Sequence, residues 1–260
     1  MLKWALGKIG AGLAHYLDQP AGKYRTFSVT PLAVLQTCLR PGDVLLIEGD
    51  KRVSVAIKYL TQSTWSHAAF YVGDALEDSA GGDPPATLIE ADLQRGVIAV
   101  PLATYANMNT RICRPVGLSA DDLQRVIGFM TERIGLRYDL KNIIDLMRYL
   151  IPTPPVPTTW RRRMIALGSG DPTRAICSTL IAQAFQSVRY PILPTVHHEE
   201  AVGRRHNREM REILQIRHHS LFTPRDFDLS PYFSVVKPTV DSGFDYRQLV
   251  WHDDETDRTN

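Results

Sequence analysis

Short apolar runs alternate with turn-forming segments over the first half of the chain. Pro41 and Gly42 form a turn signal before the apolar run at 44–47, which predicts a strand. Apolar residues recur at helical spacing over 53–60 and predict a helix. Further apolar runs follow closely and predict strands at 67–73, 86–91, 96–101 and 110–115. Closely spaced strands without helices between them are typical of an antiparallel meander.

The second half of the chain has helical periodicity. Residues 119–135 carry an apolar stripe and begin with Ser119, an N-cap signal with Asp122 three residues on. Two more helices are predicted, one at 138–150 and one that carries Cys177 near its first turn. The polar stretch 197–219 is predicted to be an exposed helix or loop. The order of elements predicts an α+β domain.

The predicted domain organisation has three parts. Residues 1–38 form an amphipathic helix and a linker, residues 39–236 form the main domain, and residues 237–260 form a polar tail. The pattern of the first helix favours packing on the domain and leaves peripheral membrane contact open. No run of eighteen apolar residues occurs, so no transmembrane span is predicted.

Composition narrows the class of protein. The hydrophobic fraction of 44% permits a well-packed core, and the formal net charge of +2 gives no reason to expect nucleic-acid binding. The three cysteines are an odd number without C-x-x-C spacing, which argues against a disulfide framework and a cysteine zinc site. A reducing, cytoplasmic compartment is therefore expected.

Three residues form a candidate for thiol chemistry. Cys177 near a helix start would have its thiolate favoured by the helix dipole, although a cysteine taken alone is more often a core residue. His67 heads an apolar strand, where a histidine is costly to bury unless it is hydrogen-bonded. Glu90 interrupts a neighbouring strand and is suited to orient an imidazole, with Asp92 as the fallback.

The segments "LRPGDVLLIEG", "STWSHAAFYVG", "LIEA", "GLRYD" and "ICSTLIAQAF" occur in an order that resembles the permuted papain-like cysteine hydrolases. The resemblance is to the YiiX/YebB-like branch of the NlpC superfamily and runs from about residue 40 to residue 233. It implies a permuted papain-like fold, with Cys177 as the nucleophile, His67 as the general base and acid, and Glu90 as the residue that orients His67.

The resemblance also implies how an oxyanion would be bound. The backbone N–H of Cys177 is one expected donor, and Ser66 and Tyr138 are candidates for the second. No cofactor or metal is expected. The expected substrate is a small molecule, lipid or peptide with an amide or ester bond, and acyl transfer is an alternative to hydrolysis.

Two other readings remain at this point. The first alternative is a non-catalytic module that holds a lipid or peptide in the same cleft. A peptidoglycan endopeptidase is the second alternative, although no convincing secretion signal supports it. Zinc binding through His197 and His198 is disfavoured because adjacent histidines point in different directions on a strand or a helix.

Overall fold

The computed structural model describes residues 16, 19–20, 30–76, 84–92, 94–137, 176–202, 208–241 and 243–248, and all structural statements concern these. The predicted helix at 138–150 and the candidate Tyr138 lie outside the described residues. So does nearly all of the predicted N-terminal helix. The domain boundaries proposed from the sequence therefore stay a prediction.

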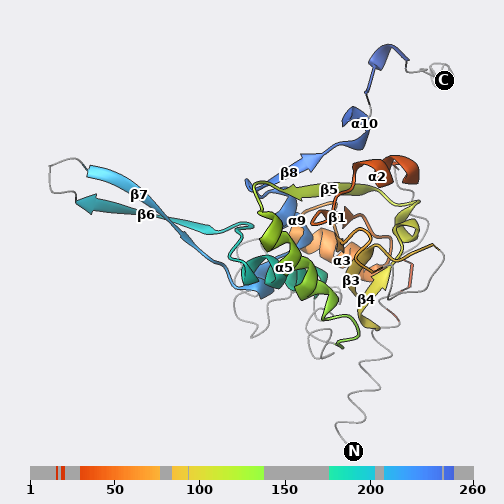
Figure 1. Ribbon diagram of the computed structural model, residues 1–260, viewed down its shortest axis with the longest axis horizontal. Coiled ribbons are helices and arrows are strands. Elements are labelled where there is room, and N and C mark those ends of the chain that lie inside the picture. The colour runs from red at the N-terminus through yellow and green to blue at the C-terminus, as the bar shows by residue number, and fades with distance from the viewer. Residues whose placement is uncertain are drawn as a thin grey trace, which may run out of the picture.

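The central element is a six-stranded antiparallel sheet with the order β4-β3-β2-β1-β5-β8 (Figure 1). Its strands are β1 (Val44–Ile47), β2 (His67–Tyr71), β3 (Leu88–Asp92), β4 (Gly96–Val100), β5 (Thr110–Pro115) and β8 (Phe233–Val236). The predicted antiparallel meander is confirmed for β2 to β4, and β1 pairs with the other side of β2. Its predicted continuation from β4 into β5 is wrong. The next strand, β5, leaves the meander and pairs with the free side of β1.

Helices surround this sheet. They are α2 (Leu32–Cys38), α3 (Arg52–Thr61), α5 (Ala120–Thr131), α8 (Ile176–Ser187), α9 (Pro224–Asp228) and α10 (Pro238–Asp241), with short 3-10 turns η1 (Leu102–Tyr105), η2 (His219–Leu221) and η3 (Tyr246–Gln248). The predicted cap of α5 is confirmed, because Ser119 accepts a hydrogen bond from the backbone N–H of Asp122. Among the described helices, none has the length and apolar character needed to cross a membrane. The α+β class is confirmed.

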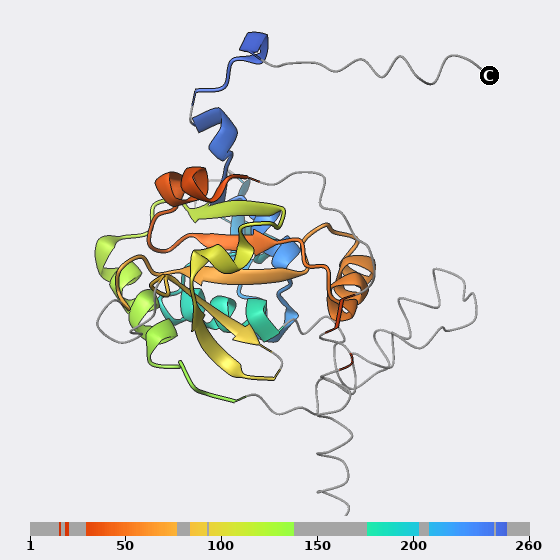
Figure 2. The same cartoon turned by 90° about the vertical axis from the view of Figure 1, so that its right-hand side faces the viewer.

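The alternation of side chains along the strands creates a core on each face of the sheet. Ala68 and Phe70 of β2 belong to the core that also contains residues of α5, α8 and α9. Ala69 and Tyr71 face the opposite core, which α2 and η1 cover. Figure 2 shows the strands between these layers, with α3 beyond the ends of β1 and β2. The predicted period-two alternation of the His67 strand is therefore present.

A long hairpin corrects one prediction. Residues 197–219 were expected to form an exposed helix or loop, but β6 (Thr195–Val202) and β7 (Arg208–Gln215) pair as a two-stranded sheet. Figure 1 shows this hairpin extending away from the six-stranded sheet. A two-stranded ribbon outside the core needs no apolar face, so its sequence lacks the alternation by which the buried strands were identified.

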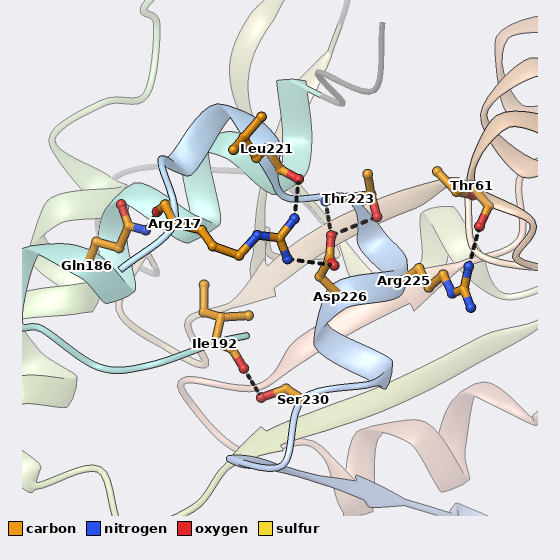
Figure 3. A network of polar contacts seen from close by, with 9 residues as sticks. All are labelled: Thr61, Gln186, Ile192, Arg217, Leu221, Thr223, Arg225, Asp226 and Ser230. Carbon is orange, nitrogen blue, oxygen red and sulfur yellow. Dashed lines mark hydrogen bonds and ion pairs between the residues drawn. The ribbon is translucent and has the colours of Figure 1, made fainter. Parts of the chain in front are cut away.

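Helix α9 forms hydrogen bonds with segments that are distant from it in the sequence (Figure 3). Asp226 and Thr223 form the capping box at the start of this helix. Arg217, which lies just beyond the end of β7, donates from Nη1 to the Asp226 carboxylate at 3.3 Å. Arg225 donates to the carbonyl of Thr61 at the end of α3. Gln186 of α8 donates to the Arg217 carbonyl at 2.7 Å. The base of the hairpin is thereby fixed to α8 and α9.

Candidate active site

The candidate site lies where β2 and β3 stop pairing with each other. These strands pair through Phe70 with Ile89 and Tyr71 with Leu88. Continuing the same register would place His67 beside Asp92, but the described pairing stops before that point. The start of β2 is therefore open on its β3 side, while its other side remains paired with β1 from Phe70 to His67.

His67 and Glu90 meet across this opening. The Nε2 atom of His67 lies 3.0 Å from Oε2 of Glu90. Glu90 is buried at 5% exposure, whereas the His67 side chain keeps 24% of its surface exposed. A buried carboxylate requires a partner, and an imidazole held at one nitrogen has its ring orientation fixed. The contact joins two of the residues that the sequence singled out.

Cys177 occupies the same opening from the α8 side. The residue is 5% exposed, its Sγ atom lies 3.9 Å from the Ser178 hydroxyl, and the neighbouring His67 side chain lowers the pKa of its thiol. Because Nε2 faces Glu90, Nδ1 is the His67 nitrogen left for the sulfur. The backbone N–H of Ala68, which has no described partner on β3, also helps to lower this pKa. Helix α8 is described from Ile176 onward, so the predicted place of Cys177 in the first turn stays a prediction.

Charges inside the site displace three pKa values. Burial raises the pKa of the Cys177 thiol, but the charge and hydrogen bond of His67 outweigh burial and lower it. Burial lowers the pKa of His67, yet Cys177 and Glu90 together hold it well above its ordinary value. Burial raises the pKa of Glu90, whereas His67 and a hydrogen bond from Tyr105 bring it below its ordinary value. These directions favour a thiolate, an imidazolium and a carboxylate.

Tyr105 is a site residue that the sequence analysis missed. It is the last residue of η1, is 5% exposed, and donates its hydroxyl to Oε2 of Glu90. Its ring centroid lies 6.2 Å from that of His67. The sequence "PLATYAN" shows no strand alternation or catalytic motif, so only the fold reveals the contact.

The remaining candidates have different positions. Ser66 is buried, and its hydroxyl accepts the backbone N–H of Gly49 at 2.9 Å. A Cβ atom at Gly49 would lie 3.0 Å from that hydroxyl oxygen, so the residue is packed tightly against the backbone. Asp92 accepts the N–H groups of Gln94 and Arg95, each at 2.8 Å. Asp92 therefore holds a turn, and Glu90 is the carboxylate that His67 contacts.

A polar cluster supports the segment immediately before His67. The indole Nε1 of Trp65 donates to Oδ2 of Asp228 at 3.1 Å, and Arg111 contacts Oδ1 of the same carboxylate at 2.7 Å. The Arg111 guanidinium also lies 4.9 Å from the Trp65 ring centroid. Asp228 ends α9, so this helix fixes the start of β2 as well as the hairpin.

No group of three or more His, Cys, Asp or Glu side chains within the described residues is arranged to hold a metal ion. His197 and His198 lie next to each other on β6, opposite Ile213 and Glu212 of β7.

Comparisons with known proteins bear on this geometry. Residues 38–149 match the model of a family described as permuted papain-like amidase enzymes, the YaeF/YiiX or C92 family. The resemblance to YiiX-like permuted papain-like proteins is confirmed. The matched residues include His67 and Glu90 and end before Cys177. The α+β chain is thus similar to a family of amidases, as the sequence order indicated.

A solved structure is also similar to the chain. It is the crystal structure of metalloprotein YiiX from Escherichia coli O157:H7, with 15% sequence identity and a TM-score of 0.44. The similarity covers 76% of this chain and 96% of that chain. No curated protein sequence gives a significant match.

Proposed function

We propose that the protein is a cysteine hydrolase that cleaves an amide or ester bond through a covalent acyl-enzyme. The observation that carries the proposal is the pair of His67 and Glu90, 3.0 Å apart where β2 and β3 stop pairing, beside the buried Cys177 whose pKa His67 lowers. A buried cysteine that only fills a core needs no such partners. The similarity to permuted papain-like amidases supports the same chemistry.

The proposed first step forms the acyl-enzyme. The thiol proton of Cys177 passes to His67, and the sulfur attacks the substrate carbonyl carbon to form a tetrahedral intermediate. The backbone N–H of Cys177 is the expected first donor to the oxyanion, and Ser66 and Tyr138 are the candidates for the second. The C–N or C–O bond then breaks, and His67 gives its proton to the leaving amine or alcohol.

The second step releases the acid. His67 accepts a proton from water, the resulting hydroxide attacks the thioester carbonyl, and the sulfur leaves and is reprotonated by His67. Glu90 keeps the imidazole oriented and offsets its positive charge in both steps. An alcohol or amine acceptor in place of water would turn hydrolysis into acyl transfer.

We further propose that the acyl donor is a lipid or peptide reached at a membrane surface. The features that favour this substrate class are the amphipathic pattern of the N-terminal residues, the apolar proline-rich sequence at 151–160 and the basic sequence at 160–163. Peptidoglycan peptides and non-catalytic ligand binding are the competing readings.

The test combines turnover with detection of the intermediate. Wild-type protein is incubated with N-acyl amino acids, phospholipid vesicles and muropeptides, and products and intact protein mass are measured. We expect turnover of one class and an acyl adduct on Cys177. Cys177→Ala should abolish both, while Cys113→Ala, a change at the other buried cysteine, should abolish neither. If the wild type turns over none of these compounds but binds one of them, and Cys177→Ala binds it equally well, the protein is a binding module instead.

A further inference from the structure

The buried carboxylate of Glu90 has two donors on one oxygen. His67 Nε2 lies 3.0 Å from Oε2, and the Tyr105 hydroxyl donates to that same atom. An ionised carboxylate only accepts hydrogen bonds, so the phenol is the proton donor in its contact. A second donor restricts the rotation of the carboxylate and thereby fixes the oxygen that faces the imidazole.

The position of Tyr105 makes the contact well defined. Its ring is part of the core beneath η1 with Leu102 and Val100, and its backbone carbonyl accepts the N–H of Met108 at 3.1 Å. The hydroxyl is the only part of the residue that a phenylalanine would lack. Filling the core therefore explains the ring, whereas the contact with Glu90 is the feature that the hydroxyl adds.

We propose that Tyr105 is a positioning residue, which holds the Glu90 carboxylate in the orientation that places Oε2 against His67 Nε2. The inference rests on the proposed function, because it assigns Tyr105 to the orientation of the general base. Tyr105 acts through Glu90 and His67. It differs from a packing residue in that its effect requires the Glu90 carboxylate.

Other titratable groups near the pair need to be considered. Glu90 faces His67 and Tyr105, and the charge of Asp92 also acts on it. His67 faces Cys177 and Glu90. Burial and the neighbouring Glu90 raise the pKa of Tyr105 well above its ordinary value, so its hydroxyl stays protonated through the neutral range. Tyr105 therefore remains a donor wherever the His67 titration is measured.

The test measures the pKa of His67 by NMR, from the pH dependence of its ring resonances. In Tyr105→Phe we expect this pKa to fall toward its ordinary value of about 6.5 because the carboxylate is no longer held against the imidazole. A rise in the pKa would overturn the proposal, since it would mean that Tyr105 merely competes with His67 for Oε2. An unchanged pKa would overturn it as well.

A double-mutant cycle separates positioning from packing. In a Glu90→Gln background, Tyr105→Phe should leave the pKa of His67 unchanged, because the carboxylate through which it acts is gone. An equal change in both backgrounds would contradict the proposal. Tyr190→Phe is the matched control: it removes a phenol that donates to the carbonyls of Val116 and Tyr232, far from Glu90 in the chain. It should not move the His67 titration.

The same samples distinguish failure of this inference from failure of the proposed function. Iodoacetamide labelling of Cys177 at pH 6.5 should be about three- to tenfold slower in Tyr105→Phe than in the wild type. If wild-type Cys177 does not label but Tyr105→Phe lowers the His67 pKa, the hydrolase proposal fails and the positioning role stands. If Cys177 labels rapidly in the wild type and Tyr105→Phe changes neither this rate nor the pKa of His67, the positioning role fails and the hydrolase proposal stands.

Discussion

Cys113 and Cys177 lie in the same hydrophobic core but in opposite chemical surroundings. Cys113 is on β5 between Val44 of β1 and Val235 of β8, and both thiols are buried. Burial strongly raises the pKa of Cys113. The pKa of Cys177 is lowered, because His67 provides a charge and a hydrogen bond there. Burial therefore suppresses a thiolate unless a cation is buried with it.

The largest expected effect is the loss of this contrast in His67→Ala. Without the imidazole, burial dominates at both cysteines, and the pKa of Cys177 should rise to at least its unperturbed value of about 8.5. The thiolate fraction at pH 6.5 would then be about 1%, so iodoacetamide labelling of Cys177 should slow about 100-fold.

Peptide mass spectrometry after labelling measures this rate for each cysteine. His218→Ala, at an exposed histidine, is the control and should label like the wild type. If Cys177 stays inert in the wild type until denaturant is added, it is a core residue like Cys113, and the enzyme proposal is wrong.

The next effect concerns Cys113 and should appear in stability. Cys113→Ser places a hydroxyl at a fully buried position between two apolar strands, and we expect a loss of about 2 kcal/mol in the free energy of unfolding. Labelling of Cys177 should not change. Urea denaturation of the variant and of Cys113→Ala measures the difference. A slower reaction at Cys177 in the folded Cys113→Ser protein would show that the two cysteines are not independent.

The sequence singled out His67 and Glu90 as candidates because each one breaks an apolar pattern. His67 begins an apolar strand and Glu90 interrupts another, and the fold brings the two together. Only the order of the motifs favoured Cys177 over Cys113 as the candidate nucleophile, since both cysteines have apolar neighbours in the sequence. The strands β1 to β4 were also predictable, because each pairs with its neighbour in the sequence.

Other features depend on contacts that no local pattern records. The strand β5 pairs with β1 across more than sixty positions of the chain, and Tyr105 reaches Glu90 from a 3-10 turn. The β6–β7 hairpin was misread because its residues follow no buried alternation. Long-range pairing and a single side-chain contact are consequences of the folded arrangement, so periodicity cannot reveal them.

Glu90→Gln should have a smaller effect than His67→Ala. The amide can still accept a hydrogen bond but carries no charge to stabilise the imidazolium. We expect about tenfold slower labelling of Cys177 at pH 6.5, measured as for His67→Ala. Asp92→Asn is the control, because Asp92 holds the turn at Gln94 and Arg95 and should leave the rate unchanged. A larger effect at Asp92 than at Glu90 would reverse the assignment of the orienting carboxylate.

The smallest expected effect is a pH-dependent contribution of the His67–Glu90 pair to stability. The pKa of Glu90 is lowered on folding, so its contribution is fully present above about pH 4.5 and is lost as the pH falls through the folded pKa. The pKa of His67 is raised, so its contribution is fully present below about pH 6.5 and is lost as the pH rises through the folded pKa. Both contributions therefore coincide between these two pH values.

A comparison in the Cys177→Ala background isolates this pair from the thiol. The difference in unfolding free energy between that variant and Cys177→Ala/His67→Ala should be largest near pH 5.5 and smaller by about 1 kcal/mol at pH 9. Urea denaturation at the two pH values measures it. A difference that grows toward pH 9 would mean that His67 is stabilised in its neutral form, and the site would then lack the cation that distinguishes Cys177 from Cys113.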